Sequence, residues 1–314
     1  TSDGLVKFDR ANWTVYKTSN SDLPHSWITS IAIDNGGNKW IGTFYGLARY
    51  SNTNWAVFNT SNSALPGNSI FTIVIDDEGC KWIGTSNGLV KYDGTDWVVF
   101  NTSNSGLPGN SIYAITIDAF GIKWIGTSYG LVKYDGTNWT VFNTSNSGLP
   151  INYVSSIAID AAGHKWIGTN NGLAKYDDTN WTLFYTSNSG LPGNRVLSFA
   201  IDGNGNKWVG SYGSYYQQGG GLAGYNGTNW TVYNTANSGL PENCVNNLLV
   251  DGDGNKWIGT RYGGLAVFKE GGIVEVNEIP LSSPTDYIVT QNYPNPFNPV
   301  TTIRFSIPTS PQTP

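Results

Sequence analysis

Residues 75–93 read Ile-Asp-Asp-Glu-Gly-Cys-Lys-Trp-Ile-Gly-Thr-Ser-Asn-Gly-Leu-Val-Lys-Tyr-Asp, and variants of this stretch recur along the 314-residue chain. Its Lys-Trp-Ile/Val-Gly motif occurs six times, with intervals of 42, 42, 42, 42 and 49 residues between successive Trp. A second series of six Trp, each preceded by Asn or Asp, has the same intervals. Twelve of the 13 Trp therefore mark an internal repeat of 42 residues. The first series is Trp40, Trp82, Trp124, Trp166, Trp208 and Trp257, and the second is Trp13, Trp55, Trp97, Trp139, Trp181 and Trp230.

Each repeat is predicted to form four strands, which we call A to D in chain order. In the copy quoted above these strands are residues 69–76, 81–85, 88–93 and 96–101. The connections are rich in Asp, Gly and Asn, as short hairpins require, and Asp76 at the end of strand A suits a turn. Both faces of strand A are apolar, because Val74 lies between Ile73 and Ile75. A sheet with two apolar faces packs between two other sheets.

These features predict an all-β protein, a β-propeller whose blades are four-stranded antiparallel sheets. The composition agrees, because 39 Gly, 14% aromatic residues and only 12% charged residues are typical of many short strands joined by tight turns. A linear solenoid is the alternative. Closure into a ring is favoured, because it hides the end faces and needs no capping repeat.

The number of blades follows from counting strands along the chain. Six A–B pairs are present, but seven C strands, so we predict six complete blades after an N-terminal half blade, with residues 273–277 as a degenerate last D strand. Thr1 aligns with Thr85, so it is expected to end a missing strand B of a longer protein, and a seven-bladed ring is favoured. In the six-bladed alternative, residues 5–16 complete the blade of residues 244–260, and residues 265–277 form an exit strand.

The pattern Ile-Asp-x-x-Gly-x-Lys-Trp-Ile-Gly-Thr-x-x-Gly-Leu-x-Lys-Tyr-Asp resembles the two-component-regulator propeller repeat, and the propeller is assigned to residues 1–277. That repeat is best known from periplasmic sensor domains of bacterial regulators, and it also occurs in secreted proteins. The resemblance implies the fold, whereas it carries almost no information about the ligand.

The composition changes after residue 277, because eight of the 14 Pro lie in residues 280–314. Residues 278–290 are interpreted as a linker. In residues 291–314, the run Tyr-Pro-Asn-Pro-Phe-Asn-Pro resembles the opening of the C-terminal sorting module of type IX secretion substrates, truncated here at Pro314. This resemblance implies a bacterium of the Bacteroidetes or a neighbouring phylum and export across the outer membrane. It also implies the type IX machinery as a partner and a secreted or cell-surface location.

Several classes of function are disfavoured. A net charge of −5 gives no electrostatic reason to bind nucleic acid, and no run of 18 apolar residues predicts a membrane span. The two histidines, His25 and His164, fall at opposite ends of their blades, so we expect no transition-metal site, no cofactor and no acid–base pair. Residues 251–255 resemble part of a calcium loop but lack its distal Glu.

The two cysteines are not expected to form a disulfide. Cys80 is placed in an A–B turn, and Cys244 begins strand A of a distant blade at the opposite end. Bonded cysteines need Cα atoms within about 7 Å, which this placement does not allow.

The candidate binding residues are those that differ between copies. They gather after the Leu-Pro of each D–A connection and in the B–C turns, two connections that share one face of a propeller. A seven-residue insertion within residues 211–220 adds to the same face. Exposed aromatic rings there suit sugars or peptides, and the absence of a charge cluster favours a neutral glycan; the alternative is that the rings plug the channel mouth. The candidate binding residues are Trp27, Tyr45, Tyr129, Tyr212, Tyr216 and Tyr262.

The sequence therefore favours a secreted, non-enzymatic propeller that binds a glycan or a peptide or protein ligand on its variable face. A structural cell-surface or extracellular assembly protein is one alternative. An extracellular sensor propeller, or a lyase or hydrolase on a propeller scaffold, is another.

Overall fold

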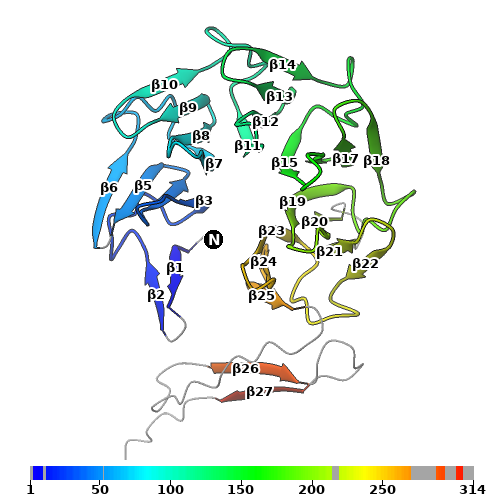
Figure 1. Ribbon diagram of the computed structural model, residues 1–314. Helices are drawn as coiled ribbons and strands as arrows, with labels where there is room; N and C mark the ends of the chain where they lie inside the picture. The colour runs from blue at the N-terminus through cyan, green and yellow to red at the C-terminus, as the bar shows by residue number, and fades with distance from the viewer. Residues whose placement is uncertain are drawn as a thin grey trace, which may run out of the picture.

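The computed structural model describes residues 3–9, 12–51, 53–213 and 219–269, together with the backbone of two strands at residues 288–293 and 302–306. Every regular element in these residues is a β-strand, as the repeat predicts. The sheets from β3 to β25 follow one another around a common centre, each with its first strand innermost (Figure 1).

Five of the described sheets contain four antiparallel strands in chain order. The first comprises β3 (Ile28–Ile33), β4 (Lys39–Thr43), β5 (Gly46–Ser51) and β6 (Asn54–Phe58). The second comprises β7 (Ile70–Ile75), β8 (Lys81–Thr85), β9 (Gly88–Tyr92) and β10 (Trp97–Phe100). The third comprises β11 (Ile112–Ile117), β12 (Lys123–Thr127), β13 (Gly130–Tyr134) and β14 (Trp139–Phe142). The fourth comprises β15 (Val154–Ile159), β16 (Lys165–Thr169), β17 (Gly172–Tyr176) and β18 (Trp181–Phe184). The fifth comprises β19 (Arg195–Ile201), β20 (Lys207–Tyr212), β21 (Gly220–Tyr225) and β22 (Trp230–Tyr233).

The remaining sheets are shorter. The sixth blade has three described strands, β23 (Val245–Val250), β24 (Lys256–Thr260) and β25 (Leu265–Phe268). Before the first blade, β1 (Leu5–Phe8) and β2 (Trp13–Tyr16) form a two-stranded sheet. Near the C-terminus, β26 (Ile288–Tyr293) pairs with β27 (Thr302–Ser306).

The described residues thus form a six-bladed propeller, preceded by the two-stranded sheet β1–β2 where the sequence predicts an N-terminal half blade. The blade number is six rather than the favoured seven. The six-bladed alternative has the right blade number, but its joining of the chain ends differs from the structure. β25 pairs with β24 as a third blade strand, and within the described residues β1 and β2 pair only with each other. The physical reason is local: Leu265 directly follows the B–C turn, so its strand folds back on β24 in the same blade. The predicted D strand at residues 273–277 lies outside the described residues, as does most of the predicted linker.

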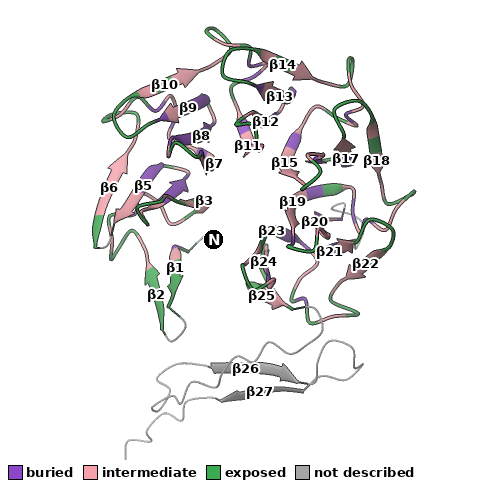
Figure 2. Cartoon of the chain, in the orientation of Figure 1, coloured by how far each residue is buried: buried purple, intermediate pink, exposed green. Residues whose placement is uncertain are grey.

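The Trp of strand B forms the core between successive blades. Trp124 has only 1% of its surface exposed and stacks on Phe142 of its own blade, with a centroid distance of 6.0 Å. From the next blade, the edge of Tyr176 approaches at 6.3 Å and the Lys165 ammonium lies 4.7 Å from the ring centroid. Figure 2 shows the buried residues concentrated in the second and third strands of the blades, such as β8 and β9. Equivalent Lys contacts join the other blades, as Lys81 to Trp40, Lys123 to Trp82, Lys207 to Trp166 and Lys256 to Trp208.

The Asp at the end of strand A has a role beyond the turn. In the blade of Trp208, one oxygen of Asp202 accepts the indole N–H at 2.9 Å, and the other accepts the amide N–H of Asn206 at 2.9 Å. The same Asp–indole bond occurs in all six described blades, with distances between 2.8 and 3.1 Å. The carboxylate therefore fixes the A–B turn and the core Trp together.

The cysteines are free, as predicted. Cys80 and Cys244 are both buried and form no disulfide. Burial raises the pKa of both thiols. Among the described residues, no helix could span a membrane.

Candidate functional site

The D–A and B–C connections meet on one face, as the repeat predicts, and we call this surface the loop face. In the first four-stranded blade, His25 and Trp27 from the D–A connection contact Phe44 and Tyr45 from the B–C turn. In the sixth blade, the backbone N–H of Arg261 in the B–C turn donates to the carbonyl of Cys244 in the D–A connection, at 3.0 Å.

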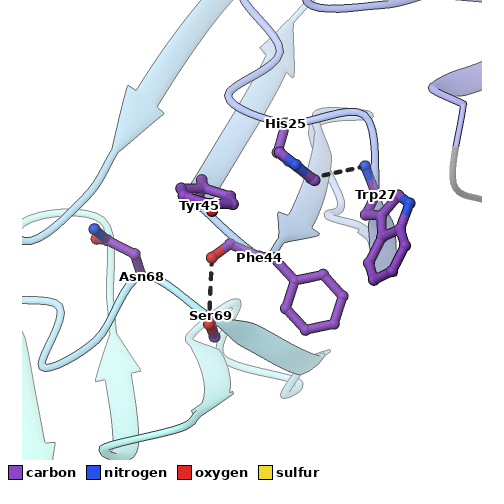
Figure 3. A pocket seen from close by; sticks show the side chains of 6 residues that line it. All are labelled: His25, Trp27, Phe44, Tyr45, Asn68 and Ser69. Atoms are coloured by element: carbon purple, nitrogen blue, oxygen red, sulfur yellow. Dashed lines mark hydrogen bonds between the residues drawn. The ribbon is translucent and has the colours of Figure 1, made fainter.

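An open pocket of about 660 Å³ lies between these connections. Figure 3 shows its lining residues, which are His25, Trp27, Phe44, Tyr45, Asn68 and Ser69. Asn68 and Ser69 precede β7, so the pocket spans two neighbouring blades. The sequence-based site missed these two because the following copy carries the same pair, Asn110 and Ser111. Asn68 and Ser69 contribute to the pocket because they lie beside the aromatic pair of the preceding blade.

Hydrogen bonds hold the pocket walls in place. The backbone N–H of Trp27 donates to Nδ1 of His25 at 3.0 Å, and the hydroxyl of Ser69 donates to the carbonyl of Phe44 at 3.2 Å (Figure 3). Because Nδ1 of His25 is the acceptor, a neutral imidazole carries its proton on Nε2, as a donor for a ligand.

Two large rings of the pocket are open to solvent. Trp27 is 50% exposed and Tyr45 is 63% exposed. The Tyr45 ring lies 4.7 Å from the His25 ring with an interplanar angle of 31°, so the two planes form a shallow aromatic wall. Exposed, oriented rings of this kind bind the apolar faces of sugars and peptide side chains.

Four aromatic rings at or near the inner strands form a row in which each ring contacts the next. Phe44 lies 6.4 Å from Phe71, Phe71 stacks 5.3 Å from Tyr113, and Tyr113 lies 4.7 Å from Tyr153. Burial raises the pKa of Tyr153, as expected for a phenol enclosed by neighbours. For these four residues the structure fits the plug interpretation rather than the binding one.

Two rings of this row, Phe71 and Tyr113, are the extra residues of β-bulges in β7 and β11. In the pairing of β7 with β8, Ile70 is opposite Thr85 and Thr72 is opposite Gly84, so Phe71 is an extra residue without a partner. The same register shift occurs at the start of every inner strand from β3 to β23. A bulge re-aims the side chain of its extra residue. The repeat pattern in the sequence contains no local signal for this bulge.

The structure separates the six predicted binding residues. Trp27 and Tyr45 lie together in the pocket. Tyr129 is 59% exposed, two blades further along, and its ring lies where a side chain at Gly109 would be. Tyr262 is 81% exposed in the sixth blade, and Tyr212 is partly buried at the end of β20. Tyr216 lies outside the described residues.

The two histidines remain apart, as expected. His164 lies in an A–B turn, where its Nδ1 is 3.1 Å from a carboxylate oxygen of Asp160. In the part of the chain that the structure describes, His25 forms no ion pair with a carboxylate, and no group of three His, Cys, Asp or Glu could hold a metal. In the partial calcium loop, the Asp251 carboxylate accepts hydrogen bonds from Trp257, Asn255 and Asp253.

Comparison with known proteins shows which solved structures have a similar fold. No protein-family model and no curated protein matches the chain. Among solved structures, it is similar to the extracellular domain of BT4673 from B. thetaiotaomicron, described as a hybrid two-component system, with 24% identity and a TM-score of 0.69. The match covers 85% of this chain and 35% of that domain, so the chain spans about a third of its length. The chain shares its propeller fold.

Two further neighbours have other functions. PorZ, a bacterial surface component of the type IX secretion system of Porphyromonas gingivalis, is 22% identical with a TM-score of 0.54, and the match covers 66% of this chain and 35% of PorZ. Virginiamycin B lyase from Staphylococcus aureus is 12% identical with a TM-score of 0.63, and the match covers 79% of this chain and 82% of the lyase. An extracellular domain of a two-component system, a secretion component and a lyase thus share this scaffold, so the function must be argued from the site.

Proposed function

We propose that this protein is an extracellular or cell-surface propeller that binds a glycan or a peptide on its loop face without catalysing a reaction. The observation that carries the proposal is the pocket in which Trp27 and Tyr45 expose their rings beside His25. These aromatic residues are not part of the repeated core, because the equivalent positions after Leu-Pro and in the next B–C turn carry Gly67, Ser69 and Asn87. Residues that the fold does not require are free to serve a ligand.

The extracellular location is supported by the neighbours and by the tail. The solved structures most like this chain include extracellular domains and a bacterial surface protein. The run Tyr-Pro-Asn-Pro-Phe-Asn-Pro at residues 293–299 resembles a type IX sorting module, and the type IX machinery is the partner that this resemblance implies.

The absence of catalysis is proposed from the chemistry of the pocket. Acid–base catalysis needs two titratable groups whose environments differ and which reach one substrate. The pocket lining contains one imidazole, that of His25, and no carboxylate. The Nδ1 atom of His25 already accepts a hydrogen bond from the backbone N–H of Trp27. Its remaining groups are aromatic rings, an amide and a hydroxyl, which suit recognition.

A binding screen tests this function. The full chain is applied to arrays of glycans and peptides, and every hit is measured by calorimetry with Trp27→Ala and Tyr45→Ala. Each change is expected to weaken binding by about 1–3 kcal/mol, as for exposed aromatic anchors.

Phe120→Ala is the matched control. Phe120 is 88% exposed, but it lies in an A–B turn on the opposite face, so its removal is expected to leave affinity unchanged. Unchanged affinity in both pocket variants, or turnover of a bound glycan or peptide, would contradict the proposed function.

A further inference from the structure

Two arginines outside the repeat positions lie on the loop face in neighbouring blades. Arg195 begins β19, and Arg261 follows β24. The Arg261 backbone is hydrogen-bonded to Cys244, which directly precedes β23, the inner strand beside β19. Both positive charges act on the Cys244 thiol, where they oppose the larger effects of burial and of the Glu242 charge, which raise its pKa. The two guanidinium groups therefore share one region of the loop face.

Each arginine lies over a tyrosine ring. The guanidinium carbon of Arg195 is 5.9 Å from the ring centroid of Tyr212, and that of Arg261 is 5.1 Å from the ring centroid of Tyr262. Cation–π contact orients a guanidinium but leaves its N–H groups free for other partners. Two adjacent Arg–Tyr pairs thus present both donors and aromatic surface.

These arginines have no acidic partner in the described part of the chain, where the ion pairs involve Lys and His side chains only. Glu242 is the acid of this region, and its charge also acts on Cys244. One oxygen of its carboxylate, Oε2, accepts the backbone N–H groups of Tyr262 and Gly263, at 2.5 and 3.0 Å, so this oxygen is engaged in the B–C turn. The donors of Arg195 and Arg261 are therefore available to an anion, even though the net charge of the chain is −5.

We propose that the loop face binds an acidic oligosaccharide, with its anionic group between Arg195 and Arg261 and its sugar ring against Tyr212 or Tyr262. This inference rests on the proposed binding function and adds to it a second site on the same face, with its ligand class. A guanidinium matches the two oxygens of a carboxylate or a sulfate with paired N–H donors. In a sugar acid, the anionic group is attached to a ring with an apolar C–H face, so charge and stacking surface occur together. The adjacent Arg–Tyr pairs present the complementary arrangement.

The expectation of a neutral glycan rested on the absence of a charge cluster. Arg195 and Arg261 lie in consecutive repeats, and the structure shows that each lies over a tyrosine ring on the loop face of its blade. An acidic peptide is the competing ligand. It is less favoured, because its carboxylates hang on flexible chains away from any stacking surface.

Calorimetry with defined oligosaccharides tests the inference on the full chain. A tetrasaccharide of galacturonic acid is expected to bind, and its carboxyl-reduced counterpart to bind at least about tenfold more weakly, because charge-assisted hydrogen bonds are lost. The affinity is expected to fall as sodium chloride is raised, since the site is exposed. A heparin tetrasaccharide distinguishes sulfate from carboxylate as the anionic group. Tighter binding of heparin assigns the site to sulfate, and tighter binding of the galacturonic acid tetrasaccharide assigns the site to carboxylate. Equal binding of the neutral sugar, or tighter binding of a tetraglutamate peptide, overturns the inference.

Variants locate the site. Arg195→Ala and Arg261→Ala are each expected to weaken binding of the acidic sugar about tenfold or more. Lys39→Ala is the control, because Lys39 lies at an A–B turn on the opposite face and its removal changes the net charge equally. If Trp27→Ala weakens binding and both arginine variants do not, the inference fails and the proposed function stands. If no glycan or peptide binds the chain, the proposed function itself fails.

Discussion

At the scale of single residues, the hydrogen bond between the strand-A Asp and the indole of the strand-B Trp recurs in all six described blades. The sequence predicts Asp202 in a turn and Trp208 in the core, and both are correct. It does not predict that they are partners, because hydrophobic periodicity contains no information about an indole N–H. The constant separation of six residues between this Asp and this Trp is the signal that could have revealed the bond.

Replacement of a core Trp should destabilise the fold strongly. Trp124→Ala removes a ring that is 1% exposed and leaves a cavity between two blades, so we expect a loss of about 3–5 kcal/mol in the free energy of unfolding. Chemical denaturation measures this loss. Trp13→Ala is the control, because Trp13 is 57% exposed, and it should cost less than about 1 kcal/mol. Equal losses in the two variants would show that the inter-blade Trp is not the core residue described here.

The same carboxylates make stability depend on pH. Hydrogen bonds from the Trp257 indole and the Asn255 side chain lower the pKa of Asp251 to about 2. In the unfolded chain, Asp titrates near about 3.9, so the stabilisation is fully present above that pH and is lost as the pH falls through about 2. In thermal unfolding followed by circular dichroism, the midpoint temperature should decrease as the pH is lowered over this range. Asp251→Asn should reduce the fall; identical pH profiles for the two proteins would argue against the assignment.

At the scale of elements, local signals predict the strands closely, whereas the site depends on contacts between strands. Strand A, predicted at residues 69–76, is observed as Ile70–Ile75, and strand B coincides with its prediction at residues 81–85. Alternation and turn residues are properties of neighbouring positions, so they can be seen in the sequence. The contacts of His25 with Tyr45 and of Arg195 with Tyr212 join residues at two different connections, which no short pattern encodes.

The Gly of strand B is explained by the inner strand of the next blade. A Cβ at Gly126 would lie 2.7 Å from a methyl group of Val154 and 3.0 Å from its carbonyl oxygen. Gly126→Ala should therefore overpack the interface and cost about 1–3 kcal/mol in chemical denaturation. At Gly259, in the sixth blade, a Cβ would meet only Asn247, at 3.5 Å, so Gly259→Ala should be tolerated. A matching loss at Gly259 would mean that intrinsic strand preference, rather than blade packing, selects the Gly.

At the scale of the whole molecule, stability should be highest in the middle blades. A blade between two others buries both faces, as for Val90 at 0% and Tyr92 at 7% exposure, whereas the equivalent Val6 and Phe8 of the first sheet are 43% and 41% exposed. At the other end, Leu265 is 55% exposed where the equivalent Leu89 is fully buried. In a repeat protein each unit is stabilised mainly by its neighbours, so units with one neighbour open first.

Hydrogen exchange followed by mass spectrometry can measure this gradient directly. We expect the backbone amides of β8, β12 and β16 to exchange most slowly, because their blades have packed neighbours on both sides. The amides of β1 and β2 should exchange fastest, followed by those of β24 and β25, since side chains of these sheets such as Val6 and Leu265 are exposed where their equivalents in the middle blades are buried. Trp124→Ala provides the internal check: it should speed exchange in the two blades that share its cavity before it affects β24. Uniform protection across all blades would mean that the ring opens as one cooperative unit, and it would refute a stability set by neighbouring pairs of blades.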